Sequence, residues 1–223
     1  MKSARAPGIG MTSRRTRDRM VQRLRERGIA DERVLAAMAA VPRHVFVEEA
    51  LASRAYEDTA LPIGFGQTIS QPFVVARMIE LLFQEGKAPQ KVLEVGTGCG
   101  YQAAVLARLV PEVYSIERLK ALHERARANL LGQKLANLRL AHGDGNAGLE
   151  KAAPFQGIIV AAAARELPEA LLRQIAPGGR MVLPLRGPHR EAQRLVLIER
   201  SGRGLIEREL DPVRFVPLEA GKA

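Results

Sequence analysis

A short apolar strand that runs into a glycine-rich turn is the feature that most constrains the fold of this chain. Residues 92–95 (Val-Leu-Glu-Val) precede Gly96-Thr97-Gly98-Cys99-Gly100, and a helical pattern begins near Tyr101. Strand and helix patterns then alternate to about Leu185. Because parallel strands need a crossover connection, usually a helix, this alternation predicts an α/β fold with a doubly wound, mostly parallel sheet.

The whole chain, residues 1–223, is predicted to form a single domain, because 223 residues with 47% apolar content suffice for one buried core. Residues 1–60 are predicted to be a mainly helical N-terminal addition to an α/β core over residues 61–223. The expected helices of this addition lie at about residues 13–27 and 31–40, with a helical turn over 44–52. Late strand patterns at residues 194–199 and 204–216 predict antiparallel strands on the sheet edge.

Residues 61–72, expected to form a loop, bring a hydroxyl to the start of a helix. Pro72 suits a first helical turn, and the apolar spacing after it has helical period, so Ser70 and Gln71 lie at or just before the N-cap. Unpaired backbone N–H groups and the positive end of the helix dipole favour an anion there, and a carboxylate is the natural guest. The alternative interpretation is that Ser70 only caps the helix.

The glycine-rich turn indicates a nucleotide-like ligand. Its G-x-G-x-G spacing differs from the G-x-G-x-x-G of dehydrogenases, and no Gly-Lys-Ser/Thr phosphate loop occurs in the sequence. Glu117 ends the next predicted strand, residues 113–117, where an acid can hold both ribose hydroxyls. Glu94 lies inside an apolar strand and needs a cation or a hydrogen-bond donor. S-adenosylmethionine, with its sulfonium and ammonium groups, meets that need better than a pyrophosphate.

A third turn, Gly143-Asp144-Gly145, follows the predicted strand at residues 138–142. The carboxyl ends of parallel strands meet at one edge of a sheet, so this turn should lie beside Gly96 and Glu117. Asp144 is placed to accept a hydrogen bond from an adenine amino group. Its alternative role is a simple Asp-Gly turn.

These motifs resemble those of the protein-L-isoaspartate O-methyltransferases, which methylate isoaspartyl residues in damaged proteins. The similar segments are residues 41–47, Tyr56, and residues 61–72, 92–102, 143–145, 177–180 and 214–218. The resemblance implies a Rossmann-like methyltransferase fold, S-adenosyl-L-methionine as cofactor, and damaged proteins and peptides containing isoaspartate as partners. The implied activity is that of a protein-L-isoaspartate(D-aspartate) O-methyltransferase, which methylates the free α-carboxyl group of an L-isoaspartyl residue.

Site residues follow from the same resemblance. It implies that Ser70 is the active-site hydroxyl. The cofactor site is assigned to Glu94, Gly96, Thr97, Gly98, Gly100, Glu117, Asp144 and Gly145, and substrate contacts are assigned to Thr68, Ile69 and Ser70. The chain departs from the family at Cys99, where a small hydroxyl residue is more usual, and at residues 160–164, which lack the usual Thr. Neither departure removes a group that the chemistry needs.

The proposed chemistry needs no general base. An isoaspartyl linkage leaves the α-carboxyl group free, and with a reference pKa of about 3.5 that group is ionised at neutral pH. The absence of an obvious His/Asp pair is therefore no objection.

The net positive charge of the sequence leaves functions other than protein methylation open. The net charge is +10, and the first 33 residues contribute +6 of it through ten basic and four acidic side chains. Val21 and Leu24 have core spacing within this segment, which favours a solvated helix face over a nucleic-acid site. A nucleic-acid methyltransferase is nevertheless the main alternative, although the chain has no Asn/Asp-Pro-Pro-aromatic run and no proline before Cys99. A cofactor-binding scaffold without catalysis is a third reading, and a dehydrogenase is the least favoured.

Composition predicts a cytoplasmic protein without a membrane span. The sequence has no 18-residue apolar run or apolar signal region, and its single cysteine suits a reducing compartment. The histidines lack metal-ligand spacing, so no metal is assigned to them. They are His44, His123, His142 and His189. A monomer is the working expectation.

Overall fold

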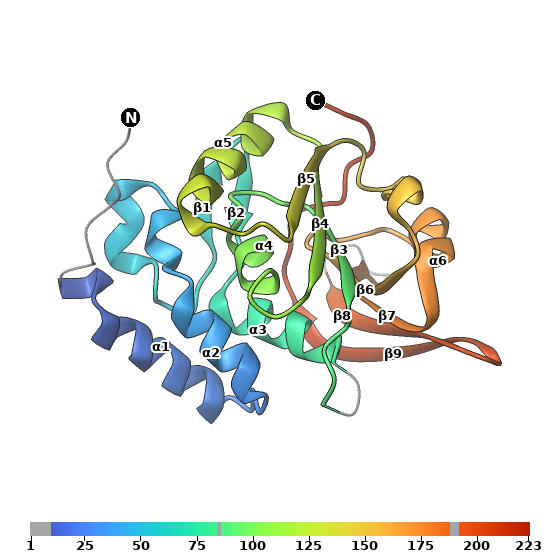
Figure 1. Ribbon diagram of the computed structural model, residues 1–223, viewed down its shortest axis with the longest axis horizontal. Coiled ribbons are helices and arrows are strands. Elements are labelled where there is room, and N and C mark those ends of the chain that lie inside the picture. The colour runs from blue at the N-terminus through green and yellow to red at the C-terminus, as the bar shows by residue number, and fades with distance from the viewer. Residues whose placement is uncertain (1–9, 84–85, 188–191) are drawn as a thin grey trace.

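A seven-stranded sheet crosses the molecule in the order β5-β4-β3-β6-β7-β8-β9 (Figure 1). The computed structural model describes residues 10–83, 86–187 and 192–223, so His189 lies outside the described residues. The strands are β3 (Lys91–Val95), β4 (Glu112–Glu117), β5 (Leu138–His142), β6 (Phe155–Val160), β7 (Ile175–Arg186), β8 (Gln193–Ser201) and β9 (Gly204–Val213). Strands β5, β4, β3, β6 and β7 are parallel to one another, and β8 and β9 are antiparallel additions. The predicted sheet is therefore confirmed.

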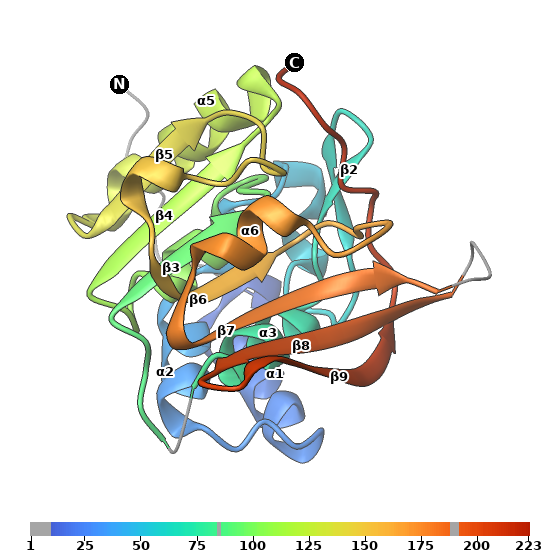
Figure 2. The same ribbon diagram turned by 90° about the vertical axis from the view of Figure 1, so that its right-hand side faces the viewer.

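Helices cover both faces of the sheet. Successive strand residues point to opposite sides, so each face presents apolar side chains that a helix can bury. Val92 belongs to the apolar cluster under α3, α4 and α5, whereas Leu93 belongs to the cluster that contains Leu171 of α6. Figure 2 shows α6 on the face that looks toward the viewer. The helices are α3 (Pro72–Leu81), α4 (Tyr101–Leu106), α5 (Lys120–Leu130) and α6 (Glu169–Gln174), with short 3-10 turns η4 (Leu131–Gln133) and η5 (Glu150–Ala152).

The N-terminal helices extend one of these two cores. Ser13 caps α1 by accepting a hydrogen bond from the Thr16 backbone N–H, and buried Met20 and Leu24 join the cluster that contains Val92. The elements are η1 (Gly10–Thr12), α1 (Arg14–Glu26), α2 (Glu32–Ala40), η2 (Arg43–Val45) and η3 (Glu49–Arg54). The single turn expected over residues 44–52 is thus two 3-10 turns.

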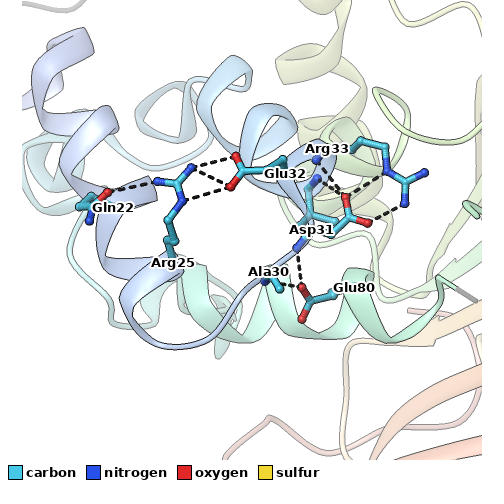
Figure 3. Close-up of polar contacts among 8 residues, drawn as sticks. Gln22, Arg25, Ala30, Asp31, Glu32, Arg33 and Glu80 are labelled. Atoms are coloured by element: carbon cyan, nitrogen blue, oxygen red, sulfur yellow. Dashed lines mark hydrogen bonds and ion pairs between the residues drawn. The ribbon is translucent and has the colours of Figure 1, made fainter. Parts of the chain in front are cut away.

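Several charges of the basic segment are used to fasten these helices (Figure 3). The Arg25 guanidinium contacts both carboxylate oxygens of Glu32, with Nη2 2.8 Å from Oε2. Glu80 of α3 accepts the backbone N–H groups of Ala30 and Asp31 at 2.7 and 2.9 Å, which fixes the start of α2. Part of the positive charge of the basic segment is therefore used in an ion pair between α1 and α2, in addition to contact with solvent. No helix in the described ranges has the length and apolar character needed to span a bilayer.

The segment expected to be a loop is a β-hairpin followed by a helix. Strands β1 (Leu61–Gly64) and β2 (Gln67–Ile69) pair antiparallel, and they bury alternate apolar side chains. Phe65 and Gly66 form the turn with φ of 55° and 69°, a conformation that glycine adopts readily. Helix α3 begins at Pro72 as predicted, with Gln71 as its N-cap.

The C-terminal tail, residues 214–223, leaves the sheet at the end of β9 and crosses the carboxyl ends of the parallel strands, as Figure 2 shows. Ala163 after β6 donates its N–H to Val216 and accepts the N–H of Leu218. Farther along, the carbonyl of Ala223 accepts the N–H of Lys120 at 2.7 Å. The strand predicted over residues 204–216 therefore ends at Val213, because the last residues bond to the loop after β6 instead.

Candidate active site

The carboxyl ends of β3, β4, β5 and β6 enclose a hollow that we call the carboxyl-end pocket. Its lining from these ends, from the hairpin and from the start of α5 consists of Ile63, Gln67, Thr68, Val95, Gly96, Gly98, Ile116, Glu117, Arg118, Leu119, Leu122, Gly145, Ala161 and Ala162. Residues 216–219 of the tail complete it. Sequence reasoning assigned no site role to these tail residues, although the motif at 214–218 had marked the segment.

Glu117 holds the glycine-rich turn in place. One oxygen of its carboxylate accepts the Gly98 N–H at 2.8 Å, and the other accepts the Leu119 N–H at 3.0 Å. The residue is 5% exposed and lines the carboxyl-end pocket. Each carboxylate oxygen has a further lone pair, so the group can also accept hydrogen bonds from ligand hydroxyls.

The glycines leave bare backbone around the pocket. Gly96 and Gly98 have φ of 94° and 55°, which side-chain-bearing residues adopt rarely. A Cβ on Gly145 would lie 2.4 Å from Cγ1 of Val95, so no side chain fits at this wall. Gly100, also predicted for the cofactor site, does not line the pocket, because it is the buried N-cap of α4 beneath Leu130.

Glu94 lies behind the turn instead of on the pocket surface. It is fully buried, and the Ser115 hydroxyl donates to its carboxyl group, while Thr97 Oγ1 lies 2.6 Å from Ser115 Oγ. Burial raises the pKa of Glu94 to about 8, and the charge of Glu117 adds to this effect. The donor that the sequence demanded is thus the Ser115 hydroxyl. Glu94 and Thr97 brace the turn from inside the protein.

Asp144 is engaged in its own turn and with the tail. One carboxylate oxygen accepts the Asn146 N–H at 2.9 Å, and the other accepts the Gly221 N–H at 2.8 Å. Burial opposes ionisation, but these backbone hydrogen bonds outweigh it and lower the pKa of Asp144. Asp144 does not line the carboxyl-end pocket, although the adjacent Gly145 does. The turn reading of the sequence describes these contacts, and the adenine contact of Asp144 stays a prediction.

Ser70 lies where two further hollows meet the carboxyl-end pocket. The Ser70 groove is lined by Thr59, Ala60, Thr68, Ser70, Gln71, Val74, Ala161 and residues 212–216. The inner hollow lies between Ile69, Ser70 and the turn at residues 96–99. Thr68 and Ala161 line all three hollows, so the groove and the carboxyl-end pocket share a boundary close to Ser70.

The Ser70 hydroxyl is free to meet a ligand. Ser70 is half-buried, and across residues 10–83, 86–187 and 192–223 its hydroxyl has no hydrogen-bond partner. The N-cap of α3 is Gln71, without a side-chain capping bond. The reading of Ser70 as a capping residue alone is therefore not supported by its contacts.

Cys99 is too buried to act as a nucleophile. It is 2% exposed, and burial raises the pKa of its thiol to about 11, which keeps it protonated at neutral pH. We expect the native protein to react with a thiol reagent at least 100-fold more slowly than the urea-unfolded protein, and Cys99→Ser to retain activity within about 2-fold. Stopped-flow titration with a chromogenic disulfide checks the first expectation. Rapid labelling of the native protein would contradict it.

Comparison with known proteins decides the family. The family described as protein-L-isoaspartate(D-aspartate) O-methyltransferase matches residues 15–223. The chain belongs to this family. Relatives described as protein-L-isoaspartate O-methyltransferases from Dechloromonas aromatica and Chromobacterium violaceum are 63% and 61% identical to it. These alignments cover 96% and 97% of this chain, and 98% and 96% of the two relatives.

Solved structures of the family share the fold. A protein-L-isoaspartate O-methyltransferase superposes with a TM-score of 0.83 and 28% identity over 92% of this chain, which corresponds to 66% of that protein. A candidate member from Plasmodium falciparum, in complex with S-adenosyl-L-homocysteine, superposes with a TM-score of 0.78 and 28% identity, covering 91% of this chain and 98% of that one. The predicted family and the Rossmann-like methyltransferase fold are both confirmed.

Proposed function

We propose that this chain transfers a methyl group from S-adenosyl-L-methionine to the free α-carboxyl group of L-isoaspartyl residues in damaged proteins and peptides. Membership of the family supports this reaction. The observation that carries the proposal is the hydroxyl of Ser70, which has no partner among the described residues and lies at the boundary that Thr68 and Ala161 form between the groove and the carboxyl-end pocket. A peptide in the groove and a methyl donor in the pocket would meet there.

The carboxyl-end pocket fits this cofactor. Gly96, Gly98 and Gly145 present bare backbone to the pocket, and Glu117 offers acceptors for ribose hydroxyls. The absence of a phosphate-binding loop agrees with a ligand that carries no phosphate. When bound, the cofactor supplies a methyl group activated by a positively charged sulfur.

The residues of the chain would position the reactants rather than move protons. The substrate carboxylate is already ionised, so Ser70 needs only to donate one hydrogen bond that orients the attacking oxygen. The start of α3 adds little positive potential, contrary to the expectation from the sequence, because Pro72 has no N–H and the Phe73 N–H is donated to the Asp58 carboxylate at 2.8 Å. Stronger binding would slow the reaction, because the carboxylate loses its charge as the methyl group moves.

A matched pair of peptides tests the proposal. Labelled S-adenosyl-L-methionine is incubated with the protein and peptides that differ only in Asp or isoAsp at one position. We expect a base-labile methyl ester on the isoAsp peptide alone. If neither peptide is labelled while the cofactor binds, the scaffold reading holds, and salt-dependent binding of RNA with methylation would support the nucleic-acid alternative.

Glu117 should control cofactor affinity. In Glu117→Gln, an NH2 group replaces one acceptor oxygen, so a ligand hydroxyl that donates to that oxygen would lose its acceptor on binding. The same NH2 would face the Gly98 or the Leu119 N–H, which lowers the stability of the free and bound protein alike. We expect about 2 kcal/mol of lost binding, or about 30-fold weaker affinity for S-adenosyl-L-homocysteine by calorimetry. Glu112→Gln, at the other end of β4, is the matched control and should bind normally. Equal affinity of the Glu117 variant and wild type would refute this role.

Further proposals concern the state of the protein. We propose that it acts in the cytoplasm as a monomer that does not use nucleic acid, supported by its single cysteine and by the arginine contacts of the basic segment. We also propose that residues 1–223 form one domain, with 1–60 as the helical addition and 61–223 as the catalytic core. The apolar cluster that joins Met20 to Val92 supports the single domain.

A further inference from the structure

The Ser70 groove has an unbalanced positive charge. Of the described residues that line it, Arg214 alone is charged. The other polar side chains of the lining are the hydroxyls of Thr59, Thr68 and Ser70 and the amide of Gln71. Arg214 is exposed, and within the described ranges its guanidinium has no hydrogen bond, ion pair or ring contact. The groove therefore offers an unused cation and no carboxylate.

The acids next to the groove already have partners. Asp58 precedes the groove residue Thr59, and its carboxylate contacts Arg27 and accepts the Phe73 N–H at 2.8 Å. Asp211, at the start of the 212–216 wall, lies 3.7 Å from Nε of Arg77. Arginines outside the groove thus face both carboxylates, although Arg77 also pairs with Glu80 at 3.2 Å. Arg214 is left to attract an anion from outside the protein.

The position of Arg214 separates it from the reacting carboxylate. It lines the Ser70 groove, but it lines neither the inner hollow nor the carboxyl-end pocket, where the methyl group would arrive. A guanidinium on the reacting oxygen would also oppose methyl transfer, because it stabilises a charge that disappears during the reaction. A cation farther along the groove would strengthen peptide binding equally before and during the reaction.

We propose that Arg214 is a specificity residue that selects isoaspartyl peptides carrying a second negative charge, an Asp or Glu side chain beside the isoaspartate. This inference rests on the proposed function and names its preferred substrate class. The guanidinium would form an exposed ion pair with that side chain, lowering KM and leaving kcat unchanged. Exposed ion pairs correspond to roughly 1.5- to 5-fold in affinity, and salt screens them.

Peptide pairs test the proposal at low salt. Each pair contains isoaspartate and differs only in Glu or Gln at one position, scanned from two residues before to two residues after it. With wild type we expect KM to be about 3-fold lower for the best-placed Glu peptide than for its Gln partner, at equal kcat. Arg214→Gln should remove this difference in KM, and Arg214→Lys should retain part of it. Added salt should reduce the difference in wild type.

Arg203→Gln is the matched control, because it removes the same charge from the exposed β8–β9 turn. It should keep the wild-type preference. If Arg214→Gln keeps the preference, the inference is wrong. If Arg203→Gln abolishes the preference equally, the preference reflects the overall charge of the protein, and the inference is also wrong. Absence of any preference in wild type would also overturn it. Methylation of the Gln peptide tests the proposed function separately, because that reaction does not require Arg214.

Discussion

Replacing Ser70 by Ala should lower kcat for an isoaspartyl peptide by about 100-fold and leave the protein folded. The hydroxyl would orient the attacking oxygen, and a misplacement of about 1 Å at a reacting atom reduces rates by roughly this factor. Stability should change by less than about 0.5 kcal/mol, because the hydroxyl has no hydrogen bond to lose among the described residues. Labelled methyl transfer and thermal unfolding measure the two effects.

Two controls separate this role from general damage. Affinity for S-adenosyl-L-homocysteine should be unchanged in Ser70→Ala, because Ser70 lines the groove and the inner hollow and not the carboxyl-end pocket. Ser201→Ala removes a hydroxyl from the last residue of β8 and should retain full turnover. A Ser70→Ala protein with wild-type kcat would contradict the assigned role.

The fold could be predicted from the sequence because its strongest signals are local. The glycines at 96, 98 and 100 mark the exit of β3, and Pro72 marks the start of α3. The hairpin at residues 61–69 was not predicted, because its pattern is short and interrupted by Pro62. The early end of β9 depends on bonds to Ala163, about fifty residues away in sequence, which no local pattern encodes.

The sequence could indicate those residues of the candidate site whose type by itself limits the role they can have, such as a carboxylate or a glycine. Glu117, Gly96, Gly98 and Gly145 line the carboxyl-end pocket, and Ser70 lies at its boundary with the groove. Position in sequence did not reveal which side of the turn Glu94 occupies, because that depends on the Ser115 hydroxyl of a neighbouring strand. The contact between Asp144 and the tail at Gly221 was missed for the same reason.

Burial of Glu94 should make the stability of the protein depend on pH. The pKa of Glu94 is about 8 in the folded protein and about 4.5 as its ordinary value, so between these values the folded chain holds a proton that the unfolded chain releases. The contribution of this group to stability is thus fully present below pH 4.5 and is lost as pH rises through 8. Glu94→Gln has no such proton.

We therefore expect the stability of wild type relative to Glu94→Gln to fall by about 3 kcal/mol between pH 5 and pH 8. Urea unfolding of both proteins at several pH values measures this difference, because the other titrating groups are common to both. The amide retains the acceptor that the Ser115 hydroxyl needs, so Glu94→Gln should fold. Glu207→Gln, on exposed β9, is the control and should run parallel to wild type. Parallel curves for Glu94→Gln as well would mean that Glu94 ionises normally, and a compensating cation would then have to lie within reach of its carboxyl group.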